Sequence, residues 1–328
     1  MVGPRIGLLG DVMLGRGVGE MLLGGTQPAE LWDPGLRELA GSLDLVMCNL
    51  ECCLSSRGTP TTLIPGKPFF FRGPPAAIAS LQAIGVRVAG LANNHLLDFG
   101  VDAGRDTVAL LRAHGIAAVG AGEDVAEARA PAIVDCAGRR VGVLALADHP
   151  DVYAAGPERF GTAYARLQDG APAWLARAIE ELRAHCELIV VFVHWGANMT
   201  SRPAAWQQRV AVSVCAAGAD LVAGHSAHVF HGVGFEHGRP VLFDLGDALD
   251  DYRVDRLLRN DLGVLAIWTP GDPEAELELV GLALDYCHTR LASGAEADWI
   301  VERLARACGE LGATVDRVDE NRVRIQPA

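Results

Sequence analysis

The stretch IGLLGDVMLGR, from Ile6 to Arg16, places an apolar run directly before a polar, glycine-containing motif. Short runs rich in Val, Ile and Leu predict buried strands. In open α/β folds, ligands bind just beyond the carboxyl ends of such strands. The stretch therefore predicts an α/β fold with a polar site at one sheet edge, where Asp11 follows the first strand.

The same arrangement occurs four more times along the chain. The apolar runs cover residues 43–48, 86–92, 188–193 and 219–223, and the motifs after them are Asn49-Leu50-Glu51, Asn93-Asn94-His95, His194-Trp195-Gly196 and Gly224-His225-Ser226-Ala227-His228. Five strand ends would bring acids, amides and histidines to a common edge. We expect six of these residues to surround one cavity: Asp11, Glu51, Asn94, His95, His194 and His228.

Helical spacing alternates with these strands and predicts a layered α/β sheet. The expected helices cover residues 75–84, 101–114, 171–186 and 204–217. After Asp250 the pattern predicts strands over 262–268, 275–286 and 323–326 and a helix over 297–311. We interpret residues 1–250 as a catalytic core and residues 251–328 as strands and a helix that complete or elaborate the same domain.

The net charge and the lengths of the apolar runs indicate which classes of binding partner the chain lacks. The chain has 328 residues and a formal net charge of −13, which argues against a broad nucleic-acid footprint. No apolar run reaches the roughly 18 residues that a membrane-spanning helix needs. The first strand begins near Arg5, which leaves no room for a signal peptide before it. These features predict a cytoplasmic protein that binds neither nucleic acid nor membrane.

The motifs resemble those of the metallophosphatase (calcineurin-like) superfamily and, within it, the CapA-type poly-γ-glutamate synthesis proteins. The resemblance covers residues 5 to 250. Family members read Gly-Asp-x-Met-Leu-Gly-Arg, Asn-Leu-Glu, Asn-Asn-His-x-x-Asp-x-Gly and His-Trp-Gly, and Asn93 to Gly100 matches the third motif closely. The resemblance implies a layered α/β/β/α sandwich with two mixed sheets.

The chain departs from the family pattern in three places. The segment from Gly224 to Val229 lacks a His-Pro pair, Asp247 stands where Asn is usual, and Asn198 stands where an acidic residue is expected. Each change alters a donor, an acceptor or a charge at the pocket rim. The departures therefore bear on the substrate and the metal rather than on the architecture.

The resemblance implies a site for one divalent metal (Zn, Mn or Fe), or for none. The candidate ligands are Asp11, Glu51, Asn94, His194, His225 and His228. Met13 replaces a usual His and Glu51 replaces a usual Asp, so the site could also work without metal. In either case the catalytic candidates are Asp11, His95, His194 and His228. Blander alternatives remain: Asp11 could cap a helix, and His194 or His228 could be structural.

Five further residues are predicted to bind substrate: Arg16, Lys67, Arg72, His149 and Trp195. Arg and Lys would bind a carboxylate or phosphate, Arg by a two-pronged contact. Lys67 and Arg72 belong to the Pro/Thr/Gly-rich segment 55–72, which follows Glu51 and is either a substrate lid or an ordinary long loop with a packed Phe cluster.

Three classes of function fit these residues. The first is an enzyme that acts on a peptide or polyamide backbone by Asp/His acid–base chemistry, because CapA-type relatives are associated with poly-γ-glutamate. Relatives of this type also include a lasso-peptide epimerase, so the sharpest version is Cα epimerisation, with a peptide-recognition protein as a candidate partner. The alternative within this class is an amide hydrolase or transferase in poly-γ-glutamate handling. The second class is a metal-dependent phosphoesterase, and the third is a non-catalytic binder of an anionic polymer.

Overall fold

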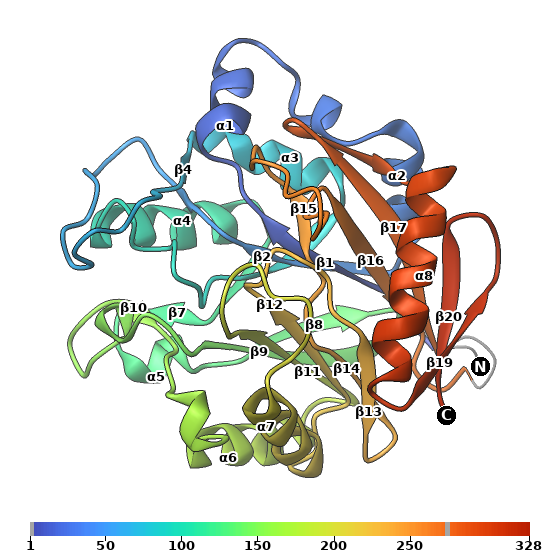
Figure 1. Cartoon of the computed structure of the whole chain (residues 1–328). Coiled ribbons are helices and arrows are strands. Elements are labelled where there is room, and N and C mark those ends of the chain that lie inside the picture. The colour runs from blue at the N-terminus through green and yellow to red at the C-terminus, as the bar shows by residue number, and fades with distance from the viewer. Residues whose placement is uncertain (1–2, 273–275) are drawn as a thin grey trace.

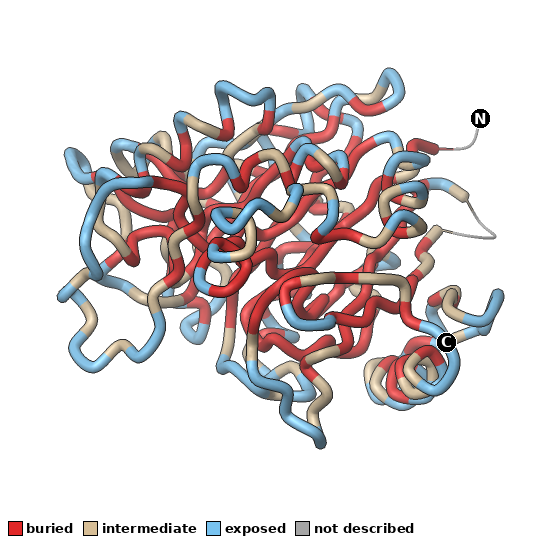
Figure 2. The backbone as a smooth tube through the Cα atoms, turned by 90° about the horizontal axis from the view of Figure 1, so that it is seen from above, coloured by how far each residue is buried: buried red, intermediate tan, exposed pale blue. Residues whose placement is uncertain are grey.

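The computed structural model describes residues 3–272 and 276–328. Two mixed β-sheets face each other at the centre, and helices cover their outer faces (Figure 1). This is the α/β/β/α sandwich that the sequence predicts. The backbone tube in Figure 2 is buried mainly in the interior of the molecule and exposed mainly at its outer turns.

Within the described residues the first sheet has ten strands, and the strand that carries Asp11 lies in its interior. The path runs β19-β20-β17-β16-β1-β2-β5-β6, while β15 pairs with β1 and β18 with β17. The bounds are β1 Ile6–Val12, β2 Leu45–Leu50, β5 Val86–Gly90, β6 Ala117–Val119, β15 Asp247–Leu249, β16 Leu262–Trp268, β17 Leu277–Asp285, β18 His288–Leu291, β19 Ala313–Arg317 and β20 Arg322–Pro327. Strands β1, β2, β5 and β6 are parallel, and β16 is antiparallel to β1.

The second sheet has six strands in the order β13-β14-β12-β11-β9-β8. Their bounds are β8 Ala132–Cys136, β9 Arg139–Ala147, β11 Leu188–His194, β12 Leu221–His225, β13 Val233–Glu236 and β14 Arg239–Leu242. Strands β9, β11, β12 and β14 are parallel. Residue His194 of β11 lies opposite His225 of β12, so both histidines end their strands at the same edge.

Apolar side chains fill three layers. Leu8, Met47 and Val88 of the first sheet share a core with Val143 and Phe192 of the second. Helices α1 (Arg16–Leu23), α2 (Pro34–Gly41), α3 (Ile78–Ala83) and α4 (Val101–Ala113) pack on the outer face of the first sheet, and α6 (Ala173–Arg183) and α7 (Ala205–Ala216) on that of the second. Because layers cover both faces, the central strands are apolar up to their carboxyl ends rather than alternating.

Short elements join these layers. Strand β3 (Cys53–Leu54) pairs with β4 (Arg72–Gly73), and β7 (Ala121–Gly122) pairs with β10 (Gly161–Thr162). The remaining short helices are α5 (Val125–Ala128) and the 3-10 turns Pro28–Leu31, Pro75–Ala77, Asp151–Tyr153 and Leu167–Asp169. The β3–β4 pair closes the base of the segment 55–72.

The C-terminal part of the chain shares the first sheet and the central core. Strands β16 to β20 extend that sheet beyond β1, and helix α8 (Ala295–Gly309) contributes Ile300, Leu304 and Cys308 to the core between the sheets. The structure has β16 over the expected residues, and it adds β18 and β19, which the sequence pattern did not predict. Ala275, where we expected the second strand to begin, lies outside the described residues. The boundary at residue 250 stays a prediction.

Across residues 3–272 and 276–328, no helix combines the length and the apolar character that crossing a bilayer requires.

Candidate active site

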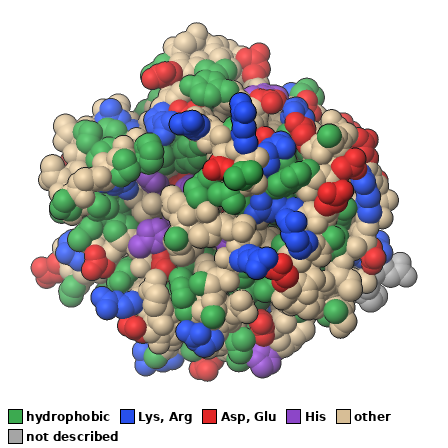
Figure 3. All heavy atoms as spheres, viewed as in Figure 1, with side chains coloured by type: hydrophobic (Ala, Val, Ile, Leu, Met, Phe, Trp, Pro, Cys, Tyr) green, Lys and Arg blue, Asp and Glu red, His purple; other side chains and the backbone are tan. Residues whose placement is uncertain are grey.

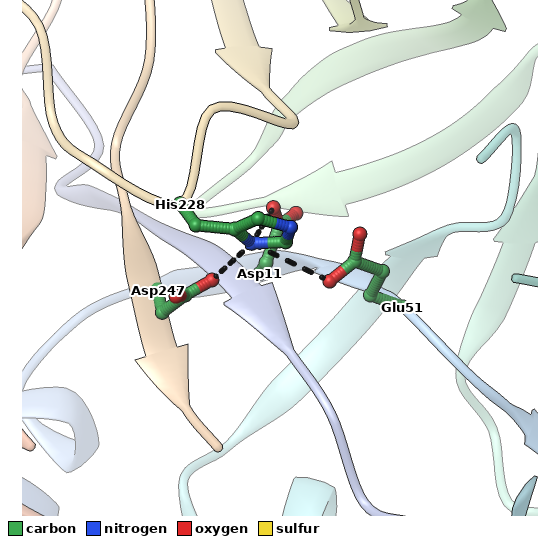
Figure 4. A group of neighbouring side chains, drawn as sticks. All are labelled: Asp11, Glu51, His228 and Asp247. Carbon is green, nitrogen blue, oxygen red and sulfur yellow. Dashed lines mark hydrogen bonds and ion pairs between the residues drawn. The ribbon is translucent and has the colours of Figure 1, made fainter. Parts of the chain in front are cut away.

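Three carboxylates and one imidazole converge at the carboxyl ends of the central strands (Figure 4). Asp11 lies on β1, Glu51 follows β2, Asp247 begins β15, and His228 lies in the loop after β12. One ligand atom from each lies within 4.8 Å of the others. The strand register explains the convergence, because Asp247 of β15 is the direct neighbour of Asp11 on β1.

His228 is surrounded by the three acids. Its Nδ1 lies 2.9 Å from Asp247 Oδ1, 3.7 Å from Asp11 Oδ2 and 3.8 Å from Glu51 Oε2. Burial alone would lower the pKa of His228, but Asp247, Glu51 and Asp11 together hold it well above its usual value. Burial raises the pKa of Asp11 to about 7 and that of Glu51 well above its usual range, and neighbouring carboxylates add to both shifts. The single positive charge of the His228 imidazolium thus cannot neutralise all three carboxyl groups around it.

Several polar atoms at this centre are buried without a hydrogen-bond partner. Among the described residues these include Glu51 Oε1, Asp247 Oδ2, His194 Nε2 and His225 Nε2. An unpaired buried polar atom costs about 1–3 kcal/mol. A divalent cation takes carboxylate oxygens and imidazole nitrogens as ligands and would offset the surplus negative charge. The donor set therefore fits a divalent metal, and it would hold the ion through Asp11, Glu51, His228 and Asp247.

Amides and backbone groups hold the Asp11 carboxylate in place. Asn49 Nδ2 donates to Asp11 Oδ1 at 2.6 Å, and the Ser226 N–H donates to Asp11 Oδ2 at 3.2 Å. Asn93 Nδ2 donates to Asn49 Oδ1 at 3.2 Å. The residue at the N-cap of α1 is Gly15, and the cap uses no side-chain hydrogen bond. Asp11 consequently serves the cluster and does not cap that helix.

A tight turn orients the His228 side chain toward the three carboxylates of the cluster. Ser226 and His228 adopt positive φ angles of 108° and 58°. The buried carboxylate of Asp244 accepts the Ala227 N–H and the Gly246 N–H, both at 2.8 Å. It thereby ties the His228 turn to the turn before Asp247. Non-glycine residues in this backbone region cost of order 1–3 kcal/mol each, and they concentrate at functional sites.

His95 lies beside the cluster and is oriented by Asp98. His95 Nδ1 is 2.6 Å from Asp98 Oδ2, and its ring stacks on Phe71 with centroids 4.0 Å apart. Asp98 also contacts Lys67 Nζ at 2.7 Å and accepts from the Tyr153 hydroxyl at 3.2 Å. Burial lowers the pKa of His95 to about 4. Because a neutral ring keeps its proton on Nδ1 toward Asp98, its Nε2 is left free to accept one.

A cavity of about 410 Å³ opens next to His95. Its wall consists of residues 64–69 from the segment 55–72 together with Asn94, His95, His149, Pro150 and Asn198. The face in Figure 3 shows histidine side chains beside a hollow. His149 joins this cavity to the buried centre, since its ring lies 5.3 Å from that of His194, whose Nε2 is 3.8 Å from Glu51 Oε1.

The expected ligands Asn94, His194 and His225 do not belong to the four-residue cluster. His194 lies beside it, with Nε2 3.8 Å from Glu51 Oε1. Asn94 lines the cavity, where its backbone carbonyl accepts from Lys67 Nζ and its buried Oδ1 has no partner among the described residues. His225 ends β12, where its ring meets Phe192 edge-on with centroids 5.1 Å apart. Burial lowers its pKa to about 3. His225 is therefore a neutral side chain packed behind the centre.

Two expected substrate-binding arginines are held by the protein itself. Arg16 pairs with Asp251 at 3.1 Å and lies over the rings of Phe69 and Phe71. Arg72 donates to the backbone carbonyls of residues 57 and 58, so it braces the loop instead of lining the cavity. Of the charged residues predicted to bind substrate, Lys67 is the one that reaches the cavity wall.

The position of Trp195 differs from our prediction that its side chain contacts the substrate. Its side chain is buried in the core under α7, stacks on Phe243, and donates Nε1–H to the Phe243 carbonyl at 2.9 Å. Successive side chains of a strand point to opposite faces. His194 points toward the cluster, so the next residue along the chain points away from it.

We expect Trp195→Phe to destabilise the protein without impairing substrate binding. The change leaves the buried Phe243 carbonyl without its donor and removes part of a packed ring, which should lower the free energy of unfolding by about 1–3 kcal/mol. Urea unfolding measures this value. Trp174→Phe on α6, whose indole nitrogen has no partner among the described residues, is the matched control. A change in KM with unchanged stability would return Trp195 to the substrate site.

Sequence reasoning missed two residues of the centre. Asp247 was noted only as a departure from a family motif. Its position directly after Leu245-Gly246 was the signal that could have placed it in the centre. Tyr252 gave no signal; its hydroxyl donates to Glu51 Oε2 at 3.1 Å, and its ring packs on Phe71 and His228. The Asp250 carboxyl, whose pKa is raised well above its usual value by burial and by Asp247, adds another acid group there.

A two-sheet sandwich with carboxylates and histidines at its strand ends is a metallophosphatase-type arrangement. The family described as bacterial capsule synthesis protein PGA_cap matches residues 5–252, and the chain belongs to this family. A probable polyglutamine synthesis accessory protein of Mycobacterium tuberculosis is 29% identical, with 97% of this chain and 95% of that protein covered. The capsule biosynthesis protein CapA of Bacillus anthracis is 24% identical, with 74% of this chain and 59% of that protein covered. Among solved structures, the NAD nucleotidase of Haemophilus influenzae has 11% identity and a TM-score of 0.45, with 92% of this chain and 56% of that one covered.

Proposed function

We propose that this protein is a metal-assisted enzyme that cleaves or transfers amide bonds of a glutamate polymer. The observation that carries the proposal is the cluster of Asp11, Glu51, His228 and Asp247, buried behind an open cavity and fitted to a divalent cation. Relatives named for capsule and polyglutamine synthesis support a polyamide substrate. None of the relatives named above is described as an epimerase, so polymer handling fits the family better than Cα epimerisation does.

The four-residue cluster, His95 and Lys67 would each have a separate role in this reaction. The four-residue cluster would bind the ion, which as a Lewis acid would polarise the attacked carbonyl and supply a nucleophile at neutral pH. His95 Nε2 would exchange a proton with the reacting group, because Asp98 fixes its Nδ1–H and burial keeps the ring neutral. Lys67 and the segment 64–69 would cover the chain bound in the cavity.

Incubation with poly-γ-glutamate in deuterated water, followed by mass spectrometry, tests the proposal. Cleavage or transfer gives chains of changed length without deuterium at Cα. Chains of unchanged length that carry Cα deuterium would establish epimerisation instead. Unchanged chains, together with turnover of a phosphate ester, would favour the phosphoesterase reading.

Asp98→Asn is expected to slow the reaction through His95. The variant removes the negative charge that His95 Nδ1–H and Lys67 face and leaves one amide oxygen as an acceptor, so kcat should fall by roughly tenfold or more, less than for complete loss of an acid–base group. The bound metal should stay unchanged, because Asp98 is outside the cluster. Asp102→Asn, an exposed acid on α4, serves as the control. A variant with reduced stability but the wild-type kcat in its folded fraction would limit Asp98 to a structural role.

A further inference from the structure

Two further hollows are lined by residues that follow Asn198 in the chain, and one of them is also lined by helix α8. Asn198 lines the cavity, Met199 lines the next hollow, of about 740 Å³, and Ser201 and Arg202 line a third, of about 310 Å³. Residues 253–256 also line the second hollow, and residues 257–258 also line the third. We call residues 198–202 the first wall and residues 253–258 the second wall. Residues 198–202 therefore line parts of all three hollows, whereas residues 253–258 line only the two outer ones.

The second wall starts at the catalytic centre. Tyr252, which directly precedes it, donates its hydroxyl to Glu51. The first wall is also joined to the centre, because the Met199 N–H donates to the Ala227 carbonyl, next to His228, at 2.8 Å. The two segments that line the outer hollows are therefore both attached next to the catalytic centre.

The two outer hollows are basic although the whole chain is acidic. Their lining contains five arginines and two carboxylates in a protein of net charge −13. Both carboxylates are engaged: Asp255 accepts the N–H groups of residues 257 and 258, and Glu310 pairs with Arg202 at 2.9 Å. Among the described residues, Arg253, Arg256 and Arg306 form no ion pair and are exposed. Figure 3 shows Lys and Arg side chains gathered over the middle of this face.

Apolar side chains lie between these arginines. Met199, Val254 and Leu257 line the hollows and are exposed, Leu257 to 89%. Exposed large apolar groups beside unpaired cations suit a ligand that alternates carboxylates with methylene groups. A γ-linked glutamate chain has this character, with one carboxylate and two methylenes in each repeat. Arginine binds carboxylates through a planar two-pronged contact.

We infer that these hollows form a binding groove for the part of a γ-glutamyl chain that extends beyond the catalytic cavity. The inference rests on the proposed function for the identity of the polymer. Arg253, Arg256 and Arg306 bind successive carboxylates, and Met199 and Leu257 pack against the methylenes between them. The groove makes the enzyme prefer long chains over short oligomers, because a short oligomer fills only the cavity.

The test compares binding of long poly-γ-glutamate with binding of tri-γ-glutamate, measured by fluorescence anisotropy in the full-length protein. The variant Arg253→Gln/Arg256→Gln/Arg306→Gln should weaken long-chain binding by roughly tenfold or more at low ionic strength, as expected for three exposed charge contacts. High salt should shrink the difference, because exposed charges are screened. The control Arg87→Gln/Arg177→Gln/Arg209→Gln makes the same change in net charge outside the groove and should bind like wild type.

The outcomes separate this inference from the proposed function. If the wild type processes the polymer and the groove variant binds it as tightly, the groove is wrong and the proposed function stands. If the wild type binds the long polymer through the three arginines but changes no bond in it, the groove stands and the proposed function falls. Tighter binding of a single-stranded oligonucleotide than of poly-γ-glutamate would assign the groove to another polyanion and overturn the inference.

Discussion

Asp11→Asn should leave a folded protein whose activity is reduced by about 10²-fold or more, the usual scale for a lost acid–base or ligand carboxylate. Asp11 is central to the cluster, and the amide keeps the shape of the side chain while removing its charge. Its oxygen can still accept from Asn49. Burial raises the pKa of this carboxyl to about 7, so exchanging it for a neutral group removes a costly buried charge and should not unfold the protein.

Steady-state kinetics and thermal unfolding together check this expectation. Asp316→Asn, an exposed acid on β19, is the control and should match wild type in both measurements. An Asp11→Asn variant that is folded and fully active would remove the cluster from the reaction, whether or not a metal takes part.

Removing divalent metal should abolish activity, and adding Zn, Mn or Fe should restore it. The reason is the excess of buried acids and the unpaired oxygen atoms of Glu51 and Asp247, which a cation would satisfy. Bound metal also stabilises the folded state by RT ln(1 + [L]/Kd), about 2.7 kcal/mol at a hundredfold excess over Kd. The melting temperature of the chelated protein should therefore rise on adding metal, independently of any assay of activity.

Glu51→Gln and His228→Asn sharpen this experiment. Both remove a cluster ligand and should lower the bound metal measured by elemental analysis, whereas His231→Asn, outside the cluster, should not. Full activity in a chelator, combined with an inactive Asp11→Asn, would instead establish acid–base chemistry by Asp and His alone.

The fold was largely predictable because each central strand is an apolar run that ends at a recognisable motif. Residues 6–12 and 188–194 illustrate this, since both are buried on two faces and need no partner to be read as strands. Strands β18 and β19 were missed because they are short and lie partly at the surface, where the hydrophobic pattern is weak.

The site was predictable only where chemistry follows directly from a strand end. Asp11, Glu51 and His228 meet because their strands or loops end at one edge. Asp247 escaped notice because its proximity depends on the pairing of β15 with β1, more than 200 positions apart in the sequence. Arg72 is held by backbone carbonyls of the loop, and no sequence pattern predicts hydrogen bonds of this kind. A cytoplasmic location likewise stays a prediction.

The pairing of β1 with β15 and β16 also bears on how the protein is made. The ribosome releases β1 first, but two of its neighbours in the sheet lie beyond residue 246. At about 5–20 residues per second, β1 waits for tens of seconds before those partners exist. Until then an apolar strand has an open edge, and Asp11 lacks Asp247. A growing chain therefore carries no assembled acidic cluster, and its open strand edge depends on protection from aggregation until β15 and β16 have emerged.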